Sequence, residues 1–342
     1  MNMKKLIFIL VLASAFASCK ESSKYQTSLS EYFAKQDAGI QTGNEKIIQI
    51  ESFGKKFNIW TKRFGNNPKT KILLLNGGPG GTHEYFQCFE NFLPQEGVEF
   101  IYYDQLGCGY SDNPNDTAYW DLNRFVEEVE QVRVALGLNK DNFYLLGHSW
   151  GGILAMQYSL KYQQNMKALI ISNMMSSCPD YDKYAEEVLA KQMDKSVLDS
   201  VKAMEARNDF ANPQYMGLLI PNFYEKHMLR KPYAEWPPLV QRAFAGMNQS
   251  LYITMQGPSE FGISGRLENW DVSKELPKIE IPTLVIGAEH DTMDPNHMKW
   301  MSTQVKNGTY AYCPNGGHMA MYDDQENYFN GLIGFIKKVE HK

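Results

Sequence analysis

The sequence predicts an α/β protein with a mostly parallel β-sheet flanked by helices and with a helical cap domain inserted in the second half of the chain. Continuous apolar runs without polar alternation recur along the chain, which indicates strands buried on both faces. Amphipathic helical patterns separate these runs, as in α/β folds. The rhythm stops at residues 174–271, which are rich in Met, Tyr, Asn and Pro and contain helical pieces but no comparable strand run.

An antiparallel hairpin is expected at the start of the fold, within residues 46–64. Ile48 and Ile50 alternate with polar residues before a turn, and Phe57 and Ile59 alternate with polar residues after it. Apolar runs then predict buried strands at residues 71–75, 100–103, 143–146, 168–172 and 283–287.

Two helices have clear amphipathic patterns. Asp121 is expected to cap the start of the first, and Gly137 is expected to end it. Its apolar face consists of Leu122, Val126, Val129, Val132 and Leu136. The second lies close to the C-terminus, and its apolar face consists of Tyr328, Leu332, Phe335, Ile336 and Val339.

The N-terminal segment has the pattern of an export signal. Two lysines precede an apolar stretch from Leu6 to Phe16, which is too short to span a membrane and is followed by small residues. Two ends fit this pattern, cleavage after Ala17 or lipid attachment to Cys19. We favour the lipid, as in bacterial lipoproteins, because the polar residues that follow can tether a folded domain to a bilayer. The expected location is the periplasm or outer membrane of a bacterial cell envelope, and the alternative is a soluble periplasmic protein.

These patterns divide the chain into consecutive parts. The predicted parts are a signal peptide at 1–18, a tether and N-terminal segment at 19–45, the first part of the core at 46–173, the helical cap at 174–271 and the second part of the core at 272–342.

The composition narrows the classes of partner. The formal net charge is −5 and no basic cluster is visible, so nucleic acid is not an expected partner. Besides Cys19 there are Cys88, Cys108, Cys178 and Cys313, whose even number permits disulfides in an exported protein but whose wide spacing does not require them. The sequence has no C-x-x-C motif and no His/Cys cluster, so we expect neither a metal nor another cofactor.

The candidate nucleophile is Ser149 in the segment GHSWGG, residues 147–152. This Gly-x-Ser-x-Gly pattern follows an apolar strand and precedes a helix, which is the context of a nucleophile elbow. Glycines on both sides let strand and helix approach closely, so the sharp turn exposes the serine. A serine hydroxyl also needs a histidine base and a carboxylate that orients it.

Later loops supply these two groups in the order expected for such a fold. Asp291 lies closest to the end of a strand, and Asp294 is the rival acid. His318 follows a short strand and two glycines, which give its loop freedom to place the imidazole over the serine. His148 adjoins the nucleophile and is expected to point away from it. The predicted catalytic triad is therefore Ser149, His318 and Asp291.

The oxyanion hole requires two backbone N–H groups. Trp150, directly after the nucleophile, is expected to supply one of them. The glycine-rich loop after the strand at residues 71–75 supplies the other, from Gly78 or alternatively from Gly77.

Several segments together resemble the proline iminopeptidases (prolyl aminopeptidases) of the α/β-hydrolase superfamily, particularly the branch that includes the tricorn-interacting aminopeptidase. They are NGGPGGTHEY (76–85), YDQLGCGYSD (103–112), GHSWGG (147–152), GPSEFGISGRLENWD (257–271), IPTLVIGAEHDTMDP (281–295) and GGHM (316–319).

The resemblance implies an α/β-hydrolase fold and a serine aminopeptidase that needs no cofactor. Such an enzyme releases N-terminal residues, preferably proline, from short peptides through an acyl-enzyme. In this family the glutamate of GPSEF binds the free α-amine of the peptide, a role that passes to Glu260. The cap aromatics are expected to close over the small substrate, and they are Phe223, Tyr224, Trp236, Tyr252 and Phe261.

Two residues depart from the family pattern. Asn76 replaces the usual histidine before Gly-Gly-Pro-Gly, and it can still hydrogen-bond within the loop. Thr292 replaces the glutamate that typically follows the catalytic aspartate, so either amine binding is weaker or Glu225 or Glu235 compensates.

Two other functions stay open at this point. A carboxylesterase-like enzyme for small uncharged esters would use the same triad, and the loss of a carboxylate at Thr292 favours it. A surface lipoprotein that binds peptides without catalysis belongs to a different class, and the complete triad argues against it.

Overall fold

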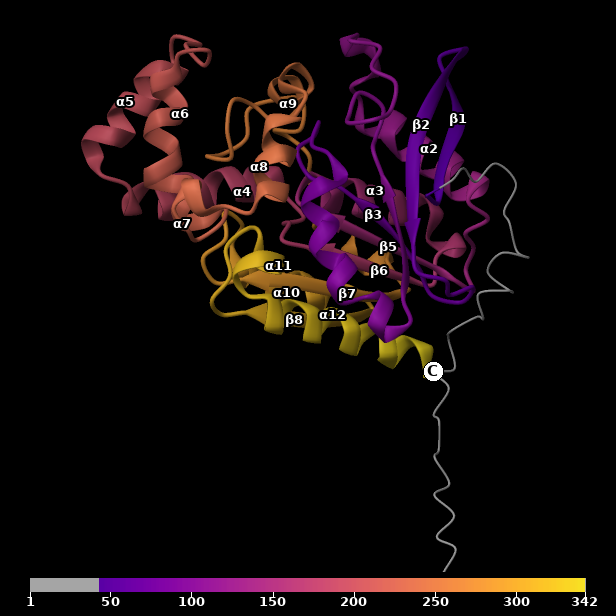
Figure 1. The fold of residues 1–342 in the computed structure, drawn as a ribbon. Coiled ribbons are helices and arrows are strands. Elements are labelled where there is room, and N and C mark those ends of the chain that lie inside the picture. Colours follow the sequence, from indigo (N-terminus) through magenta and orange to yellow (C-terminus); the bar gives the residue numbers. More distant parts are fainter. Residues whose placement is uncertain (1–42, 342) are drawn as a thin grey trace, which may run out of the picture.

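The computed structural model of the protein describes residues 43–341. The predicted signal peptide, the anchor at Cys19 and nearly all of the predicted tether lie outside these residues. Within them, one sheet of eight strands forms the core (Figure 1). The strands are β1 (Glu45–Ser52), β2 (Lys55–Phe64), β3 (Lys71–Leu75), β4 (Glu99–Tyr103), β5 (Phe143–His148), β6 (Ala168–Ser172), β7 (Pro282–Ala288) and β8 (Asn307–Cys313).

The strand order is β1-β2-β4-β3-β5-β6-β7-β8. The β1–β2 hairpin is antiparallel, with Ile50 opposite Phe57, and β2 also runs antiparallel to β4. The strands from β4 to β8 pair in parallel. This sheet confirms the predicted fold class, the opening hairpin and each predicted buried strand.

Helices cover both faces of the sheet, and the side chains of each strand alternate between them. Leu73 and Leu75 of β3 belong to the core under α2, α3 and α10, whereas Ile72 and Leu74 belong to the core under η1 and α12. These and the remaining core helices are η1 (His83–Asn91), η2 (Pro94–Glu96), η3 (Thr117–Tyr119), α2 (Leu122–Ala135), α3 (Trp150–Tyr162), η4 (Gln163–Asn165), η9 (Leu276–Lys278), α10 (Pro295–Gln304), α11 (Ala320–Asp323) and α12 (Gln325–Glu340).

The predicted ends of α2 are confirmed by its capping contacts. The Asp121 carboxylate accepts a hydrogen bond from the backbone N–H of Arg124 at 3.1 Å, which satisfies one of the free donors of the first turn. Gly137, just beyond the helix, has φ +64°, a left-handed conformation that glycine adopts without strain.

A layer of helices lies between β6 and β7 and forms the cap at the upper left of Figure 1. Its two connections to the core meet in a bridge between Ser177 and Asp271. The cap boundaries at 174 and 271 stay predictions. The helices are α4 (Cys178–Tyr184), η5 (Ala185–Leu189), η6 (Ala190–Gln192), α5 (Lys195–Glu205), α6 (Pro213–Leu219), η7 (Ile220–Tyr224), α7 (Glu225–His227), η8 (Tyr233–Glu235), α8 (Pro238–Ala245) and α9 (Gln249–Met255).

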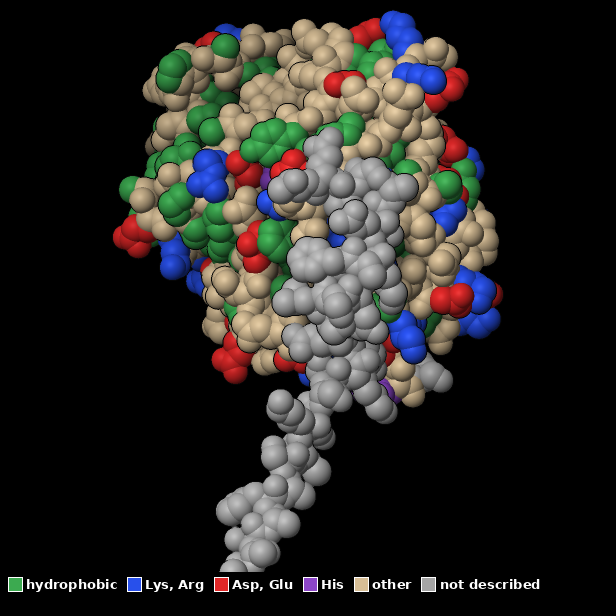
Figure 2. Space-filling model, turned by 45° about the vertical axis from the view of Figure 1, so that its right-hand side comes forward, with side chains coloured by type: hydrophobic (Ala, Val, Ile, Leu, Met, Phe, Trp, Pro, Cys, Tyr) green, Lys and Arg blue, Asp and Glu red, His purple; other side chains and the backbone are tan. Residues whose placement is uncertain are grey.

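The described residues present charges of both signs on the face shown in Figure 2, and four of them are buried cysteines. Figure 2 shows one face of the molecule, on which basic and acidic side chains are interspersed. In residues 43–341, none of the helices is long and apolar enough to cross a bilayer. Cys88, Cys108, Cys178 and Cys313 are all buried free thiols, so the structure does not use the disulfides that their even number permitted.

Candidate active site

Ser149 lies on a strained turn between β5 and α3. Its backbone has φ 57° and ψ −128°, values that a non-glycine residue adopts only when its surroundings impose them. The neighbouring glycines explain how the turn is built. A Cβ on Gly147 would lie 1.9 Å from the carbonyl oxygen of Gly151, and a Cβ on Gly151 would lie 2.1 Å from that of Leu75. Strand and helix therefore pack backbone against backbone, as the sequence predicts.

The carboxyl ends of the parallel strands bring the predicted acid and base together. Asp291 follows β7 and His318 follows β8, its neighbour in the sheet. The imidazole Nδ1 of His318 lies 2.7 Å from Oδ1 of Asp291, and both side chains are fully buried. The rival acid, Asp294, instead caps α10 by accepting a hydrogen bond from the N–H of Asn296 at 2.8 Å.

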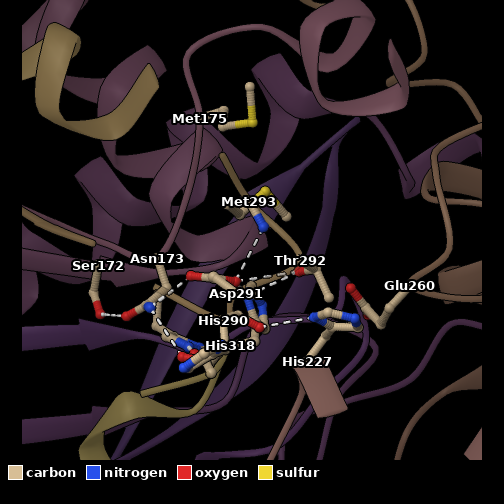
Figure 3. Close-up of polar contacts among 12 residues, drawn as sticks. Ser172, Asn173, Met175, His227, Glu260, His290, Asp291, Thr292, Met293 and His318 are labelled. Carbon is tan, nitrogen blue, oxygen red and sulfur yellow. Dashed lines mark hydrogen bonds and ion pairs between the residues drawn. The ribbon is translucent and has the colours of Figure 1, made fainter. Parts of the chain in front are cut away.

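The Asp291 carboxylate sits in a network of donors (Figure 3). Its Oδ2 accepts a hydrogen bond from the side-chain amide of Asn173 at 2.7 Å, and its Oδ1 accepts one from the N–H of Met293 at 3.1 Å. The Thr292 hydroxyl lies 3.3 Å from the same Oδ1 and 3.2 Å from Nδ1 of His318. These contacts hold the carboxylate where its Oδ1 can accept the Nδ1–H of the imidazole.

Asn173 is a site residue that the sequence analysis missed. It directly follows β6 and has φ 53°, a left-handed conformation that asparagine tolerates better than most residues. Its position after a strand at the same edge of the sheet was the available signal, but asparagine is common in loops and this signal is weak.

The ionisation of His318 is set by opposing effects. Burial disfavours the imidazolium and lowers its pKa, but the Asp291 carboxylate and its hydrogen bond raise the pKa, and Glu260 raises it further, so the net shift is upward. Because Nδ1 faces Asp291, the neutral ring presents Nε2 as a proton acceptor. Among residues 43–341 this buried Nε2 has no hydrogen-bond partner.

Ser149 and His318 line the same pocket, together with Glu260 from the cap. The open space of this pocket is about 400 Å³ and is continuous with the solvent. The serine hydroxyl does not hydrogen-bond Nε2 of His318 in this structure, a contact that often tightens only when substrate is bound. The described residues of the wall include no Lys or Arg, and they are Gly77, Gly78, Gly81, Thr82, Tyr85, His148, Ser149, Met228, Ala243, Phe244, Met247, Glu260, His318 and Met319.

Tyrosine side chains hold Glu260 in the wall of this pocket. Its Oε1 accepts a hydrogen bond from the Tyr252 hydroxyl at 2.7 Å, its carbonyl accepts one from Tyr181 at 2.6 Å, and its N–H donates to Tyr224 at 3.1 Å. Burial raises the pKa of Glu260, and the positive charge of a protonated His318 and the Tyr252 hydrogen bond oppose this rise. Glu260 is thus a buried residue of the pocket wall, and the described residues that line this pocket include no Lys or Arg to pair with its carboxyl group.

The proposed substitutes for a second amine-binding carboxylate do not reach this pocket. Glu235 is exposed, and Glu225 accepts a hydrogen bond from the N–H of Tyr233 at 2.7 Å. The five cap aromatics are buried, and none of them lines the pocket of Ser149, but Tyr224 and Tyr252 line an adjoining pocket together with Glu260. Their closure over the substrate stays a prediction. The apolar part of the pocket wall consists of Met228, Ala243, Phe244, Met247 and Met319.

The oxyanion loop favours Gly78 over Gly77 as a donor. The N–H of Gly77 is already bonded to the Tyr85 hydroxyl at 2.6 Å, whereas that of Gly78 has no hydrogen-bond partner in residues 43–341. Asn76 bonds within the loop as expected, donating to the carbonyl of Gly81 at 2.6 Å. The N–H of Trp150 lies in the first turn of α3, where backbone donors have no partner within the helix.

His148 does not point away from the site as expected. It lines the pocket, and its Nε2 lies 2.9 Å from the carbonyl oxygen of His318. The cap reaches the same loop, because the N–H of His318 donates to the carbonyl of His227 at 2.6 Å and that of Met319 donates to Met228 at 2.8 Å. The main chain of His318 is therefore held from both sides.

No group of three or more His, Cys, Asp or Glu side chains in the described part of the chain is arranged to hold a metal ion. The groups in this pocket that can take part in a reaction include the imidazole of His318 and the hydroxyl of Ser149.

The chain is similar to known proteins over most of its length. The family model described as the alpha/beta hydrolase fold matches residues 71–325. A proline iminopeptidase of Flavobacterium johnsoniae is 58% identical over 293 residues, covering 86% of this chain and 98% of the relative. One from Elizabethkingia meningoseptica is 56% identical over 298 residues, covering 86% and 99%. The crystal structure of the proline iminopeptidase of Mycobacterium smegmatis is 26% identical, covers 87% of this chain and 99% of its own, and superposes with a TM-score of 0.76.

Proposed function

The chain belongs to the proline iminopeptidases of the alpha/beta hydrolase fold family, and from this we propose how its own residues carry out the reaction. It is a serine hydrolase of the prolyl aminopeptidase kind, which releases proline from the N-terminus of peptides. Membership of the tricorn-interacting branch stays a prediction. In our proposal the catalytic residues are Ser149, His318 and Asp291.

One observation carries the proposal. A buried imidazole nitrogen without a partner, Nε2 of His318, shares a pocket with a serine on a strained turn, and its other nitrogen is bonded to Asp291. Leaving a buried polar atom unpaired costs roughly 1–3 kcal/mol, so such an atom calls for a functional explanation. A general base that awaits the serine proton is that explanation.

The steps follow from this arrangement. His318 takes the proton of Ser149 as the serine oxygen attacks the carbonyl carbon of the N-terminal residue. Asp291 stabilises the imidazolium, and the N–H groups of Gly78 and Trp150 stabilise the oxyanion. The imidazolium then protonates the leaving amine, so that the peptide bond breaks and an acyl-enzyme remains. Water, deprotonated by His318, hydrolyses this ester and releases the amino acid.

The cap side of the pocket supports recognition of a short peptide with a free N-terminus. Glu260 offers a carboxylate to the ammonium group of the substrate, and a charge-assisted hydrogen bond of this kind is stronger than a neutral one. The apolar wall of Met228, Phe244, Met247 and Met319 suits the ring of an N-terminal proline. Because the carboxylate and the serine line one small pocket, a substrate amine bound at Glu260 places the first peptide bond near Ser149.

Replacing Ser149 by Ala tests the mechanism. The variant is expected to lose nearly all hydrolysis of proline β-naphthylamide, and to lose covalent labelling by a serine-directed phosphonate, while its unfolding temperature stays close to that of the wild-type protein. Wild-type turnover by Ser149→Ala would refute the mechanism. Unchanged labelling of the variant would mean that another serine is the nucleophile.

Export with a lipid at Cys19 is a separate proposal that rests on the N-terminal sequence pattern. The mass of the mature N-terminus tests it, because a diacylated cysteine, a free Ser18 after ordinary cleavage and an uncleaved Met1 give three different masses.

A further inference from the structure

A chain of hydrogen bonds joins the oxyanion loop to the loop that carries His318. The N–H of Gly77 donates to the Tyr85 hydroxyl at 2.6 Å, this hydroxyl lies 3.2 Å from Nδ1 of His148, and Nε2 of His148 lies 2.9 Å from the carbonyl oxygen of His318. The side chains of Tyr85 and His148 are buried. The mechanism described above uses neither of them.

The direction of each hydrogen bond follows from the chemistry of the groups. A carbonyl oxygen can only accept, so Nε2 of His148 carries a proton. Burial, with a smaller effect of His318, lowers the pKa of His148 to about 3, so the ring is neutral and its Nδ1 accepts. Tyr85 therefore donates to Nδ1 and accepts from Gly77. These hydrogen bonds together fit only one tautomer of the neutral His148 ring, the one with its proton on Nε2.

The sheet alone does not fix the distance between these two loops. The oxyanion loop follows β3 and the His318 loop follows β8, and in the sheet β5, β6 and β7 stand between them. His148 is the last residue of β5 and directly precedes Ser149, so the chain of hydrogen bonds crosses beside the nucleophile. It spans the gap beside Ser149, where the two loops must act on the same peptide bond of the substrate.

We propose that Tyr85 and His148 are positioning residues that hold the oxyanion loop and the His318 loop in place on either side of Ser149. This inference rests on the proposed function of those loops. The base must reach the serine proton while Gly78 reaches the carbonyl oxygen, and displacements of about 1 Å can lower rates by roughly 100-fold. Tyr85 and His148 act through these groups without exchanging protons with the substrate.

Tyr85→Phe is the most conservative test, because it removes one oxygen atom and leaves Gly77 and His148 without their partner. Tyr102→Phe is the matched control. Tyr102 is also buried, and its hydroxyl donates to Oε1 of Glu90 at 2.9 Å and lies 3.4 Å from the carbonyl oxygen of Phe86, so it is not a member of the chain of hydrogen bonds. A general effect of losing a buried hydroxyl would appear in both variants.

Two substitutions of His148 test its hydrogen bonds to Tyr85 and to His318 separately. Asn can place an acceptor near the position of Nδ1 and so keep the contact with Tyr85, but it is too short to reach the His318 carbonyl. Gln can place a donor near the position of Nε2 and so keep the contact with His318. Partial rescue by either variant, relative to His148→Ala, is a result that a purely space-filling role would not give.

The measurements are kcat and KM for proline β-naphthylamide, the rate of phosphonate labelling and the unfolding temperature. We expect Tyr85→Phe to lower kcat and the labelling rate by roughly 10- to 100-fold with KM within about twofold, given that loss of one oxyanion donor costs roughly 100- to 1,000-fold. Tyr102→Phe is expected to stay within about threefold of wild type. Tyr85→Phe combined with His148→Gln is expected to lose little more than the worse single variant, since both break one chain.

Equal kinetic effects of Tyr85→Phe and Tyr102→Phe would overturn the inference, as would a wild-type kcat in Tyr85→Phe or fully additive losses in the double variant. If His148 variants do not fold, the comparison of the two tyrosine variants still decides. A failure of the proposed function is distinguishable, because it would appear in Ser149→Ala as turnover that does not depend on the serine.

Discussion

Glu260→Gln tests how much the cap carboxylate contributes to recognition of the substrate amine. The variant keeps the volume of the side chain and an oxygen that accepts from the Tyr252 hydroxyl, so only the charge is lost. Removing one partner of a buried, hydrogen-bonded charge pair costs roughly 2–5 kcal/mol. Glu260 lines a pocket that is open at one side, so we expect the lower part of this range, roughly 2–3 kcal/mol, which corresponds to about a 30- to 150-fold loss of kcat/KM.

The assay compares two substrates of the same enzyme. Proline β-naphthylamide carries the amine, and a p-nitrophenyl ester of a small acid without an amine does not. Only turnover of the first should fall in Glu260→Gln. Glu235→Gln is the matched control, because Glu235 also lies in the cap but is exposed and does not line the pocket. Equal losses on both substrates in Glu260→Gln would refute amine recognition by Glu260. Wild-type hydrolysis that is faster for the ester than for the amide, at equal leaving-group reactivity, would also refute it and would favour an esterase.

The same variant changes the pH dependence in a defined direction. Glu260 and Asp291 both raise the pKa of His318, and His318 acts as a base only when it is unprotonated, above that pKa. Without the charge of Glu260 the pKa of His318 falls, so the acidic limb of kcat/KM for the amine-free ester should move to lower pH. An unchanged limb, or one moved to higher pH, would contradict the electrostatic coupling of the two residues.

Two further pairs of variants test the site and its scaffold. Asp291→Asn is expected to lower kcat on the order of 10³- to 10⁴-fold, because an amide favours the wrong tautomer of His318. Asp294→Asn is expected to keep near wild-type activity in the same kinetic assay, because asparagine also caps a helix well. Gly151→Ala is expected to lower the free energy of unfolding by roughly 3 kcal/mol or more in denaturant titrations, because its Cβ would lie 2.1 Å from a backbone oxygen. Gly334→Ala, in α12 with open space around it, is expected to raise that free energy by roughly 0.5–1 kcal/mol.

The parts of the site that follow from local rules could be predicted from the sequence. A strand, a glycine-flanked serine and a helix specify the elbow at Ser149, because no larger residue fits beside the backbone contacts there. Parallel strands bring their carboxyl ends to one edge, so two loops far apart in the chain, those of Asp291 and His318, were expected to meet. The structure brings these two together and leaves Asp294 at a helix end.

The parts that depend on packing across the sheet could not be predicted. Tyr85 and His148 lie in segments that resemble the family, but nothing local in the sequence indicates their hydrogen-bond partners, which lie on other loops, and the same holds for Asn173. The expectation that His148 points away considered only its neighbour, Ser149. It missed that the carbonyl of His318, which follows β8, offers an acceptor beside the end of β5. The same limit applies to the cap aromatics, since helical pattern alone does not say which face of a cap helix meets the pocket.

The choice of tyrosines around Glu260 has a functional reason. A buried carboxylate is usually paired with a cation, because an unpaired buried charge is unfavourable. A Lys or Arg beside Glu260 would satisfy the charge, but it would also compete with the substrate ammonium for the same oxygens. The Tyr252 hydroxyl holds the carboxyl group of Glu260, and the Tyr181 and Tyr224 hydroxyls hold its backbone, so the residue is fixed in place without a Lys or Arg. In our proposal the N-terminus of the peptide is the cation that completes the pair, and the unfavourable burial of Glu260 in the free enzyme then favours a charged amine over a neutral group.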